Sequence, residues 1–259
     1  MTGLTLTPVG TQPPRFVFLH GLFGRGRNWT RIAQGLLPHG GSVLVDLPNH
    51  GTSPWTEQIS FPGMAQAVNA EVETLDAPVV LVGHSLGGKV AMWAALSRPE
   101  LYAGLAVVDI SPTDSGQVSA FGPYIAAMQA IDLTTLQSKA EADQLLTAAV
   151  PSLAVRQFLL TNLRDRGGWH WQPNLELLAA SLPELAGWPD AGDRQFVGPT
   201  SWIVGGRSHY FRPGDLDTMQ RHFPAVGQVV VPDAGHWVHA DQPEAVIAAL
   251  AALSAASPR

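Results

Sequence analysis

The sequence predicts an α/β protein with a mostly parallel, doubly wound sheet and an inserted helical cap. Short apolar runs recur along the chain, and helical patterns separate them. Each run is continuously apolar rather than alternating, which is typical of strands covered by helices on both faces. The alternation breaks once, over residues 112–198, where helical patterns follow one another without a convincing strand.

The apolar runs and the helical patterns alternate in the order that a parallel sheet requires. The expected strands are Phe16–Leu19, Ser42–Asp46, Val79–Val82, Leu105–Asp109, Ser201–Val204 and Gly227–Val231. The expected helices between and after them are Trp29–Leu37 with an Asn28 cap, Phe61–Leu75 after Ser60, Leu86–Leu96 and Pro243–Leu253. Such sheets bind ligands beyond the carboxyl ends of their strands. The side chains suited to chemistry at those ends are His20, Asp46, Ser85 and Asp109.

The helical insertion is expected to cover the carboxyl edge of the sheet as a cap. Its helical patterns are Pro123–Ile131, Leu136–Ala149, Leu153–Leu163 and a fourth around Asn174–Leu182. The predicted division is therefore a core of residues 1–111 and 199–259 and a cap of residues 112–198. A separate helical domain is the alternative that the sequence leaves open.

The amino-acid composition excludes several classes of function. With 259 residues, 46% of them hydrophobic and 14% charged, the chain is expected to be ordered and large enough for a full core. The net charge of −6, without a Lys/Arg cluster, argues against nucleic acid as a partner. The chain contains no cysteine, which excludes disulfides, thiolate zinc sites and cysteine nucleophiles.

The sequence carries no signal for a membrane or a metal. The first residues have neither a basic nor an apolar segment of a secretory signal, and no apolar run approaches the roughly 18 residues of a membrane span. A cytoplasmic location is the resulting expectation. Nine histidines occur, but no H-E-x-x-H motif or carboxylate-rich cluster accompanies them, so no metal and no cofactor is expected. The oligomeric state is left open.

The segment Gly83-His84-Ser85-Leu86-Gly87 directly follows the apolar run that ends at Val82. A strand that ends in G-x-S-x-G and leads into a helix is the pattern of a nucleophile elbow, in which the serine occupies a strained turn. The pentapeptide alone is a weak signal, and the strand and helix around it strengthen it. Ser85 is therefore the candidate nucleophile.

A nucleophilic serine needs a base, and His236 is the best candidate. It follows the last expected strand, in a loop where Gly235 gives the backbone freedom. His239 is the competitor, but it lies where the closing helix starts, so we expect it to point elsewhere.

The orienting carboxylate is harder to identify. The strand Ser201–Val204 leads into a loop in which Ser208, not a carboxylate, occupies the usual position. Asp215 and Asp217 come later and are expected to begin a surface helix. Asp109 ends a buried strand and needs a hydrogen-bond partner, which Ser208 can provide. We favour Asp109 over Asp217.

The oxyanion formed during acyl transfer needs two N–H donors. One is expected from Leu86, the residue after the nucleophile, and the other from the loop after the first strand. Leu22 is the expected donor there, with Phe23 as the alternative. His20 is expected to hold this loop through hydrogen bonds.

With these motifs in order, the chain resembles the α/β-hydrolase superfamily over essentially its whole length. Within it the chain is similar to small bacterial serine esterases of the YbfF type and their mitochondrial ABHD11-like relatives. The shared segments are His20–Gly24 with Asn28-Trp29, Asp46–Ser53, Gly83–Lys89, Val107–Pro112 and Gly235–Ala240. One departure is Pro48, where the subgroup tends to carry arginine.

The resemblance implies a triad of Ser85, His236 and an aspartate, beneath a helical cap. In the YbfF-type group the acid follows the strand after the nucleophile helix, which corresponds to Asp109, and a serine at the position of Ser208 supports it. This agrees with the interpretation of the residues themselves.

The expected function is cofactor-independent hydrolysis of carboxylic esters or thioesters with small to medium acyl groups, through an acyl-enzyme. One alternative is a lyase or C–C bond hydrolase on the same triad, with Arg25, Arg27 or Arg207 holding an acidic substrate. Another is a binding protein on an inactive hydrolase fold. The expected partner is a small-molecule ester or thioester, and the sequence does not identify its acyl or alcohol group.

Overall fold

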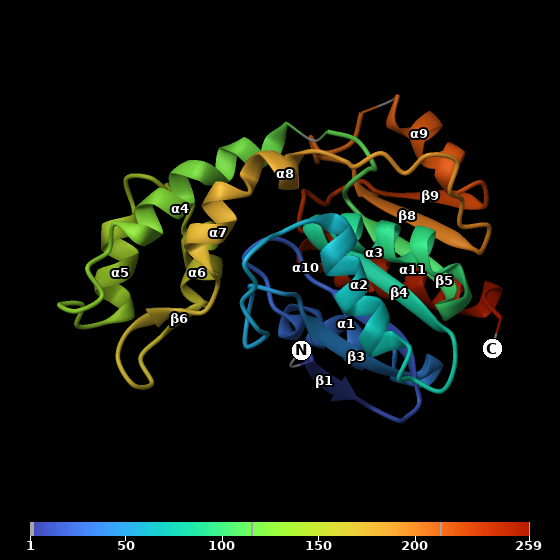
Figure 1. The fold of residues 1–259 in the computed structure, drawn as a ribbon, viewed down its shortest axis with the longest axis horizontal. Coiled ribbons are helices and arrows are strands. Elements are labelled where there is room, and N and C mark those ends of the chain that lie inside the picture. The colour runs from blue at the N-terminus through green and yellow to red at the C-terminus, as the bar shows by residue number, and fades with distance from the viewer. Residues whose placement is uncertain (1–2, 115, 213, 259) are drawn as a thin grey trace.

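The computed structural model describes residues 3–114, 116–212 and 214–258 and centres on a seven-stranded sheet with helices on both faces (Figure 1). The strands are β1 (Thr5–Val9), β2 (Pro14–Leu19), β3 (Gly41–Asp46), β4 (Val79–His84), β5 (Tyr102–Val108), β8 (Thr200–Gly205) and β9 (Val226–Val231). Their order is β1-β3-β2-β4-β5-β8-β9, with β1 antiparallel to β3 and all other neighbours parallel. The predicted α/β fold with a mostly parallel sheet is confirmed.

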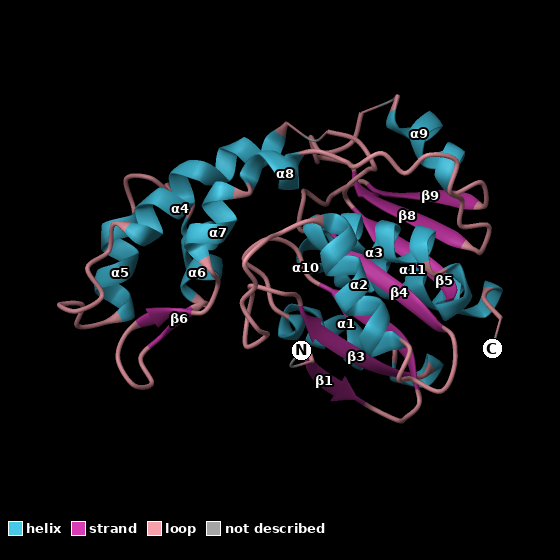
Figure 2. Cartoon of the chain, viewed as in Figure 1, coloured by secondary structure: helices cyan, strands magenta, loops and turns pink. Residues whose placement is uncertain are grey.

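The helices that follow the strands pack on opposite faces of the sheet (Figure 2). They are α1 (Thr30–Gly35), α2 (Phe61–Val72), α3 (Leu86–Ser97), α9 (Asp215–His222), α10 (Val238–Asp241) and α11 (Pro243–Ala256). Short 3₁₀ helices are η1 (Gly26–Trp29), η2 (Leu37–His39), η3 (Pro99–Leu101) and η4 (Gln117–Phe121). Helices α2 and α3 contact each other on one face, and α1 and α11 contact each other on the other.

The central strands are apolar throughout because both of their faces are buried. In β2, Val17 and Leu19 belong to the core beneath α2 and α3, whereas Phe16 and Phe18 belong to the core beneath α1 and α11. Strand β9 departs from this expectation, because it lies at the sheet edge and Val230 is 54% exposed.

Two helix starts illustrate the local signals. Ser60 caps α2 as expected, with its Oγ accepting from the Gly63 N–H at 3.1 Å. The expected Asn28 cap is wrong: Asn28 lies inside η1, and its Oδ1 accepts from the Arg25 N–H at 2.7 Å.

Residues between β5 and β8 form a helical segment that lies to one side of the sheet (Figure 1). Its helices are α4 (Gly122–Gln129), α5 (Lys139–Leu146), α6 (Leu153–Leu160), α7 (Leu175–Ala180) and α8 (Leu182–Ala186). The expectation that it holds no strand is wrong, since β6 (Leu163–Arg164) pairs with β7 (His170–Trp171). Strands of two residues are too short to leave a periodic pattern. None of the helices in the described part of the chain has the length and apolar character needed to cross a membrane.

Candidate active site

Ser85 stands in the sharp turn between β4 and α3. Its φ of 52° and ψ of −120° lie in a region that L residues rarely adopt. A Cβ added to Gly83 would lie 2.2 Å from the Gly87 carbonyl oxygen, and one on Gly87 would lie 2.5 Å from that of His20. The two glycines are therefore required by close backbone approach, and this approach holds Ser85 in its strained conformation.

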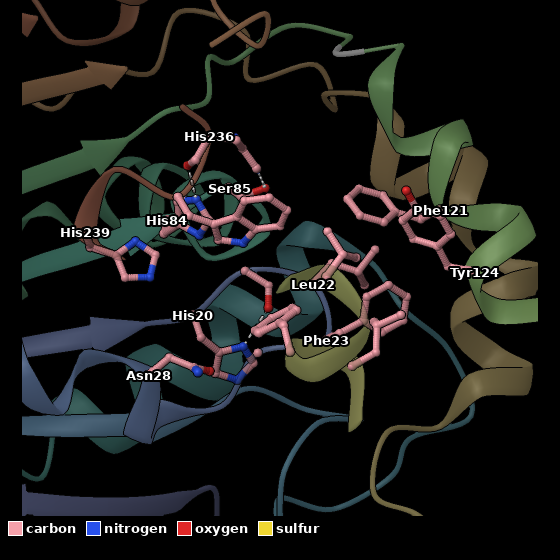
Figure 3. A pocket seen from close by; sticks show the side chains of 16 residues that line it. His20, Leu22, Phe23, Asn28, His84, Ser85, Phe121, Tyr124, His236 and His239 are labelled. Carbon is pink, nitrogen blue, oxygen red and sulfur yellow. Dashed lines mark hydrogen bonds between the residues drawn. The ribbon is translucent and has the colours of Figure 1, made fainter. Parts of the chain in front are cut away.

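His236, in the loop after β9, lies between Ser85 and Asp109 (Figure 3 shows the serine side). Its Nε2 is 3.0 Å from the Ser85 Oγ, and its Nδ1 is 2.7 Å from the Asp109 Oδ2. Because a carboxylate only accepts hydrogen bonds, Nδ1 carries the proton and Nε2 is left to accept one. The result is a continuous hydrogen-bonded chain from the strained serine to the carboxylate.

Asp109 is held from several sides at the end of β5. It is 1% exposed and has a φ of 54°, a left-handed conformation that is rare outside glycine. The Gly205 N–H donates to its Oδ1 at 2.9 Å, and the Ser208 hydroxyl donates to its Oδ2. These donors compensate the burial of the carboxylate and fix its direction toward His236.

The later aspartates make no hydrogen bond with His236. Asp217 is exposed on α9. Helix α9 begins at Asp215 as expected, but its N-cap is Gly214 and Asp215 is buried rather than exposed at the surface. Its carboxylate accepts from the Ser111 hydroxyl at 2.9 Å and from the Arg212 N–H at 3.1 Å, which ties α9 to the loop after β5.

Leu22 and Leu86, the residues expected to donate to the oxyanion, both lie close to Ser85. Leu86 is the first residue of α3, and Leu22 lines a cavity together with Ser85. A Cβ on Gly21, the residue before Leu22, would lie 3.2 Å from the Cβ of Ser85. Within the described ranges neither N–H has a protein acceptor. The positive end of the α3 dipole adds to the attraction of this position for negative charge.

His20 holds the loop that carries Leu22. Its Nε2 accepts from the Leu47 N–H at 3.0 Å, and its Nδ1 donates to the Gly21 carbonyl at 2.8 Å. Burial lowers the pKa of His20 to about 3, so the ring is neutral and keeps this tautomer.

Two further histidines pack behind His236, and the sequence did not indicate this. The His84 Nε2 donates to the His236 carbonyl at 2.8 Å, and burial lowers the pKa of His84 well below its usual value. The His239 ring lies 4.7 Å from that of His84 and stacks on Trp29 at 4.4 Å. His239 makes no hydrogen bond with Ser85, but it lines the cavity instead of pointing away as expected. Burial lowers its pKa to about 4.

Tyr210 also contacts His236, and no sequence motif marks it. The two rings stack at 3.7 Å with an angle of 15° between their planes. The Tyr210 N–H donates to the Ser208 Oγ at 3.2 Å, so one short loop positions both the imidazole and the hydroxyl beside Asp109.

Two cavities meet at Ser85, and both have walls from the sheet core and from the helical segment (Figure 3 shows the first). The first encloses about 510 Å³ and the second about 310 Å³, counting the space that is open to solvent. Side chains of the first include His236, Trp237, His239, Tyr124, Val155 and Phe158. The second is lined by Leu22, Ser85, Leu86, Lys89, Ile110, Val118, Phe121 and Leu185. Leu22 and Phe121 belong to both and stand between them.

The described residues place neither a metal site nor the three expected arginines at these cavities. Within residues 3–114, 116–212 and 214–258, no group of three or more His, Asp and Glu side chains has the spacing of a metal site. In the same ranges neither cavity is lined by Arg25, Arg27 or Arg207.

Comparison with known proteins gives one consistent result. The profile of the alpha/beta hydrolase family matches residues 16–249. The sn-1-specific diacylglycerol lipase ABHD11 of Mus musculus is 40% identical over 239 residues, which cover 89% of this chain and 78% of the mouse protein. Esterase YbfF of Escherichia coli K12 is 32% identical, with 90% of each chain covered. A solved structure of a marine microorganism esterase has a TM-score of 0.89 at 30% identity, covering 95% of this chain and 97% of the other.

Proposed function

The chain belongs to the alpha/beta hydrolase family, and we propose that it is a serine esterase that uses Ser85, His236 and Asp109 as its catalytic triad. Carboxylic ester hydrolysis is the activity of its esterase and lipase relatives. The observation that carries the assignment of residues is the hydrogen-bonded chain from the Ser85 Oγ through the His236 ring to the Asp109 carboxylate. A serine outside such an arrangement is a weak nucleophile.

The first half-reaction transfers the acyl group to the enzyme. The Ser85 Oγ attacks the carbonyl carbon while the His236 Nε2 takes its proton. The tetrahedral intermediate then collapses, the bond to the leaving oxygen or sulfur breaks, and Nε2 returns the proton to that atom. Asp109 keeps the proton on Nδ1 throughout and stabilises the imidazolium.

The Leu22 and Leu86 N–H groups stabilise the negative oxygen of the intermediate. They lack other acceptors within the described ranges, so no hydrogen bond has to break when the oxyanion forms. Donors placed in this way account for about 10²–10³-fold in kcat each in other hydrolases.

The second half-reaction releases the acid. A water molecule replaces the leaving group, gives its proton to the His236 Nε2 and attacks the ester carbonyl of acylated Ser85. Nε2 then returns the proton to the Ser85 Oγ, and the carboxylic acid leaves. Esters and thioesters share this route, because only the leaving atom differs.

Residues 112–198 act as a cap over the core of residues 1–111 and 199–259. They supply walls of both cavities, including Phe121, Tyr124 and Leu185. The mainly apolar lining of both cavities suits acyl groups, and we propose small to medium ones. The alternative of a lyase or C–C bond hydrolase is less supported, because Arg25, Arg27 and Arg207, the arginines expected to hold an acidic substrate, line neither cavity among the described residues.

A fluorophosphonate probe tests the proposal directly. The probe should label the protein at Ser85 and abolish hydrolysis of p-nitrophenyl butyrate, and Ser85→Ala should lose both labelling and hydrolysis. The matched control is Ser181→Ala, because Ser181 lines neither cavity and should leave both readouts unchanged. Labelling at another serine, or activity retained by Ser85→Ala, would refute the assignment.

A further inference from the structure

Tyr210 covers one face of the His236 imidazole. The centres of the two rings lie 3.7 Å apart and the angle between their planes is 15°, so the rings are stacked face to face. Two other aromatic rings lie near the imidazole in the described part of the chain, but His84 is tilted by 45° and Trp237 lies edge-on at 62°. The triad mechanism uses the two nitrogen atoms of His236 and gives the face of its ring no role.

The charge of His236 changes during catalysis. When its Nε2 takes the proton of Ser85, the neutral imidazole becomes an imidazolium cation. The side chain is 11% exposed, so water solvates this cation only weakly. The Asp109 carboxylate contacts the cation at the edge of the ring, 2.7 Å from Nδ1, and not over a ring face.

The π electrons of an aromatic ring make its face negative, so the face attracts a cation that lies over it. At 3.7 Å the His236 ring is well within the roughly 6 Å over which this attraction acts. Burial raises the pKa of Tyr210 to about 12, so the phenol is neutral at pH 7 and acts through its ring. The attraction is stronger after proton transfer than before it, which is the condition for an interaction to accelerate the reaction.

The other histidines around His236 do not provide this stabilisation. Burial lowers the pKa of His84 well below its usual value and that of His239 to about 4, so both rings are neutral near pH 7. In the described ranges Asp109 is the one ionised group that hydrogen-bonds to the imidazole. Tyr210 is therefore the partner that remains for the face of the imidazolium.

Resting on the proposed esterase function, we propose that Tyr210 is a positioning residue whose ring face stabilises the His236 imidazolium that forms during proton transfer. The loop geometry supports this role, because the Tyr210 N–H donates to the Ser208 Oγ at 3.2 Å and the Ser208 hydroxyl donates to Asp109. One loop thus contacts the carboxylate at the edge of the imidazolium and supplies the aromatic ring at its face. Tyr210 lines neither cavity among the described residues, so its loss should weaken His236 as a base and leave substrate binding unchanged.

Fluorinated phenylalanines at position 210 test the proposal, because fluorine withdraws electron density from the ring face with little change in ring shape. Tyr210→Phe is compared with variants that carry a monofluorinated and a trifluorinated phenylalanine, so the hydroxyl is absent throughout. With p-nitrophenyl butyrate, Tyr210→Phe should keep kcat within about threefold of wild type. From there kcat should fall progressively with fluorination, by about threefold to tenfold at the trifluorinated ring, while KM stays within about twofold.

The pH profile separates stabilisation of the cation from a general loss of packing. On the acid side kcat/KM falls as His236 becomes protonated, so a less stable imidazolium moves this fall to lower pH. We expect the midpoint of the acid limb to decrease by about half a pH unit or more in Tyr210→Leu, which keeps an apolar side chain without a π face. Tyr210→Phe should keep the wild-type midpoint.

The matched control is His209→Leu, which should leave both kcat and the midpoint unchanged. His209 precedes Tyr210 in the same loop, is exposed, and has no ring contact with His236 among the described residues. If kcat and the midpoint stay constant along the fluorinated series, Tyr210 only fills space and the proposal is wrong. A loss of more than about tenfold in Tyr210→Phe would assign the effect to the hydroxyl and also overturn it. Absence of hydrolysis and of fluorophosphonate labelling in the wild-type protein would instead contradict the esterase function itself.

Discussion

Replacing Asp109 by asparagine changes the proton on His236 with little change in shape. The Gly205 N–H donates to Oδ1 of the native aspartate at 2.9 Å, so the amide oxygen of the asparagine takes that position. The amide NH₂ then faces the His236 Nδ1, which the native Oδ2 contacts at 2.7 Å. Because that NH₂ only donates, Nδ1 has to accept, and the ring proton moves to Nε2.

With its proton on Nε2, His236 cannot take the proton of Ser85, so the first chemical step loses its base. The same exchange in a serine protease triad lowers kcat about 10⁴-fold. We expect a loss of about 10³–10⁴-fold in kcat for Asp109→Asn, with KM changed little because the carboxylate does not line either cavity.

The assay is steady-state hydrolysis of p-nitrophenyl butyrate, with circular dichroism to establish that each variant is folded. The control is Asp217→Asn on α9, where an exposed carboxylate makes no hydrogen bond with His236, and its kcat should stay within about twofold. A folded Asp109→Asn variant that keeps more than a tenth of kcat would refute this reasoning. A larger loss in Asp217→Asn would move the acid to α9.

Two further changes have expected outcomes. Ser208→Ala removes one donor to Asp109 but leaves Gly205, so kcat should fall only about tenfold or less, measured with p-nitrophenyl butyrate. Lowering the pH from 7 to 5 should reduce the free energy of unfolding by up to about 2 kcal/mol for each histidine that is buried in the neutral form. In the unfolded chain such a histidine is protonated below about pH 6.5. In the folded chain burial lowers its pKa to about 3 or 4, so it stays neutral over this pH range. Urea unfolding at both pH values checks this loss, and the histidines concerned are His20, His50 and His239.

The sheet was predictable because its central strands carry their own signal. Strands such as β2 place successive residues in two different cores, so every position is apolar and the run stands out in the sequence. Strand β1 was not predicted, because it is half-buried and antiparallel and contains Pro8, which an edge strand tolerates. The pairing of β6 with β7 was not predicted, because a strand of two residues is too short to show an apolar pattern.

The candidate site was predictable where the environment that one residue needs determines the identity of its neighbours. Ser85 lies in a turn that requires neighbouring glycines. A buried Asp109 requires hydrogen-bond donors, and Ser208 stands where a carboxylate is usually found, so the sequence indicated that Ser208 donates to Asp109. Whether the carboxylate is Asp109 or Asp217 still depended on the side-chain geometry around His236.

The surroundings of Lys89 were not predictable, because they depend on a distant part of the chain. In the sequence Lys89 is an ordinary helix residue, and nothing local distinguishes it from a solvated lysine. Its Nζ is held by the carbonyls of Ala186 and Gly187, nearly a hundred residues later, and lies over the Phe61 ring of α2. The positions of Ser85, His236 and Asp109 are thus set by local turns of the core, whereas the walls of the second cavity also depend on how the helical segment packs beside α3. Exchange of residues in α8 should therefore alter acyl preference without altering the reaction of Ser85 with a fluorophosphonate.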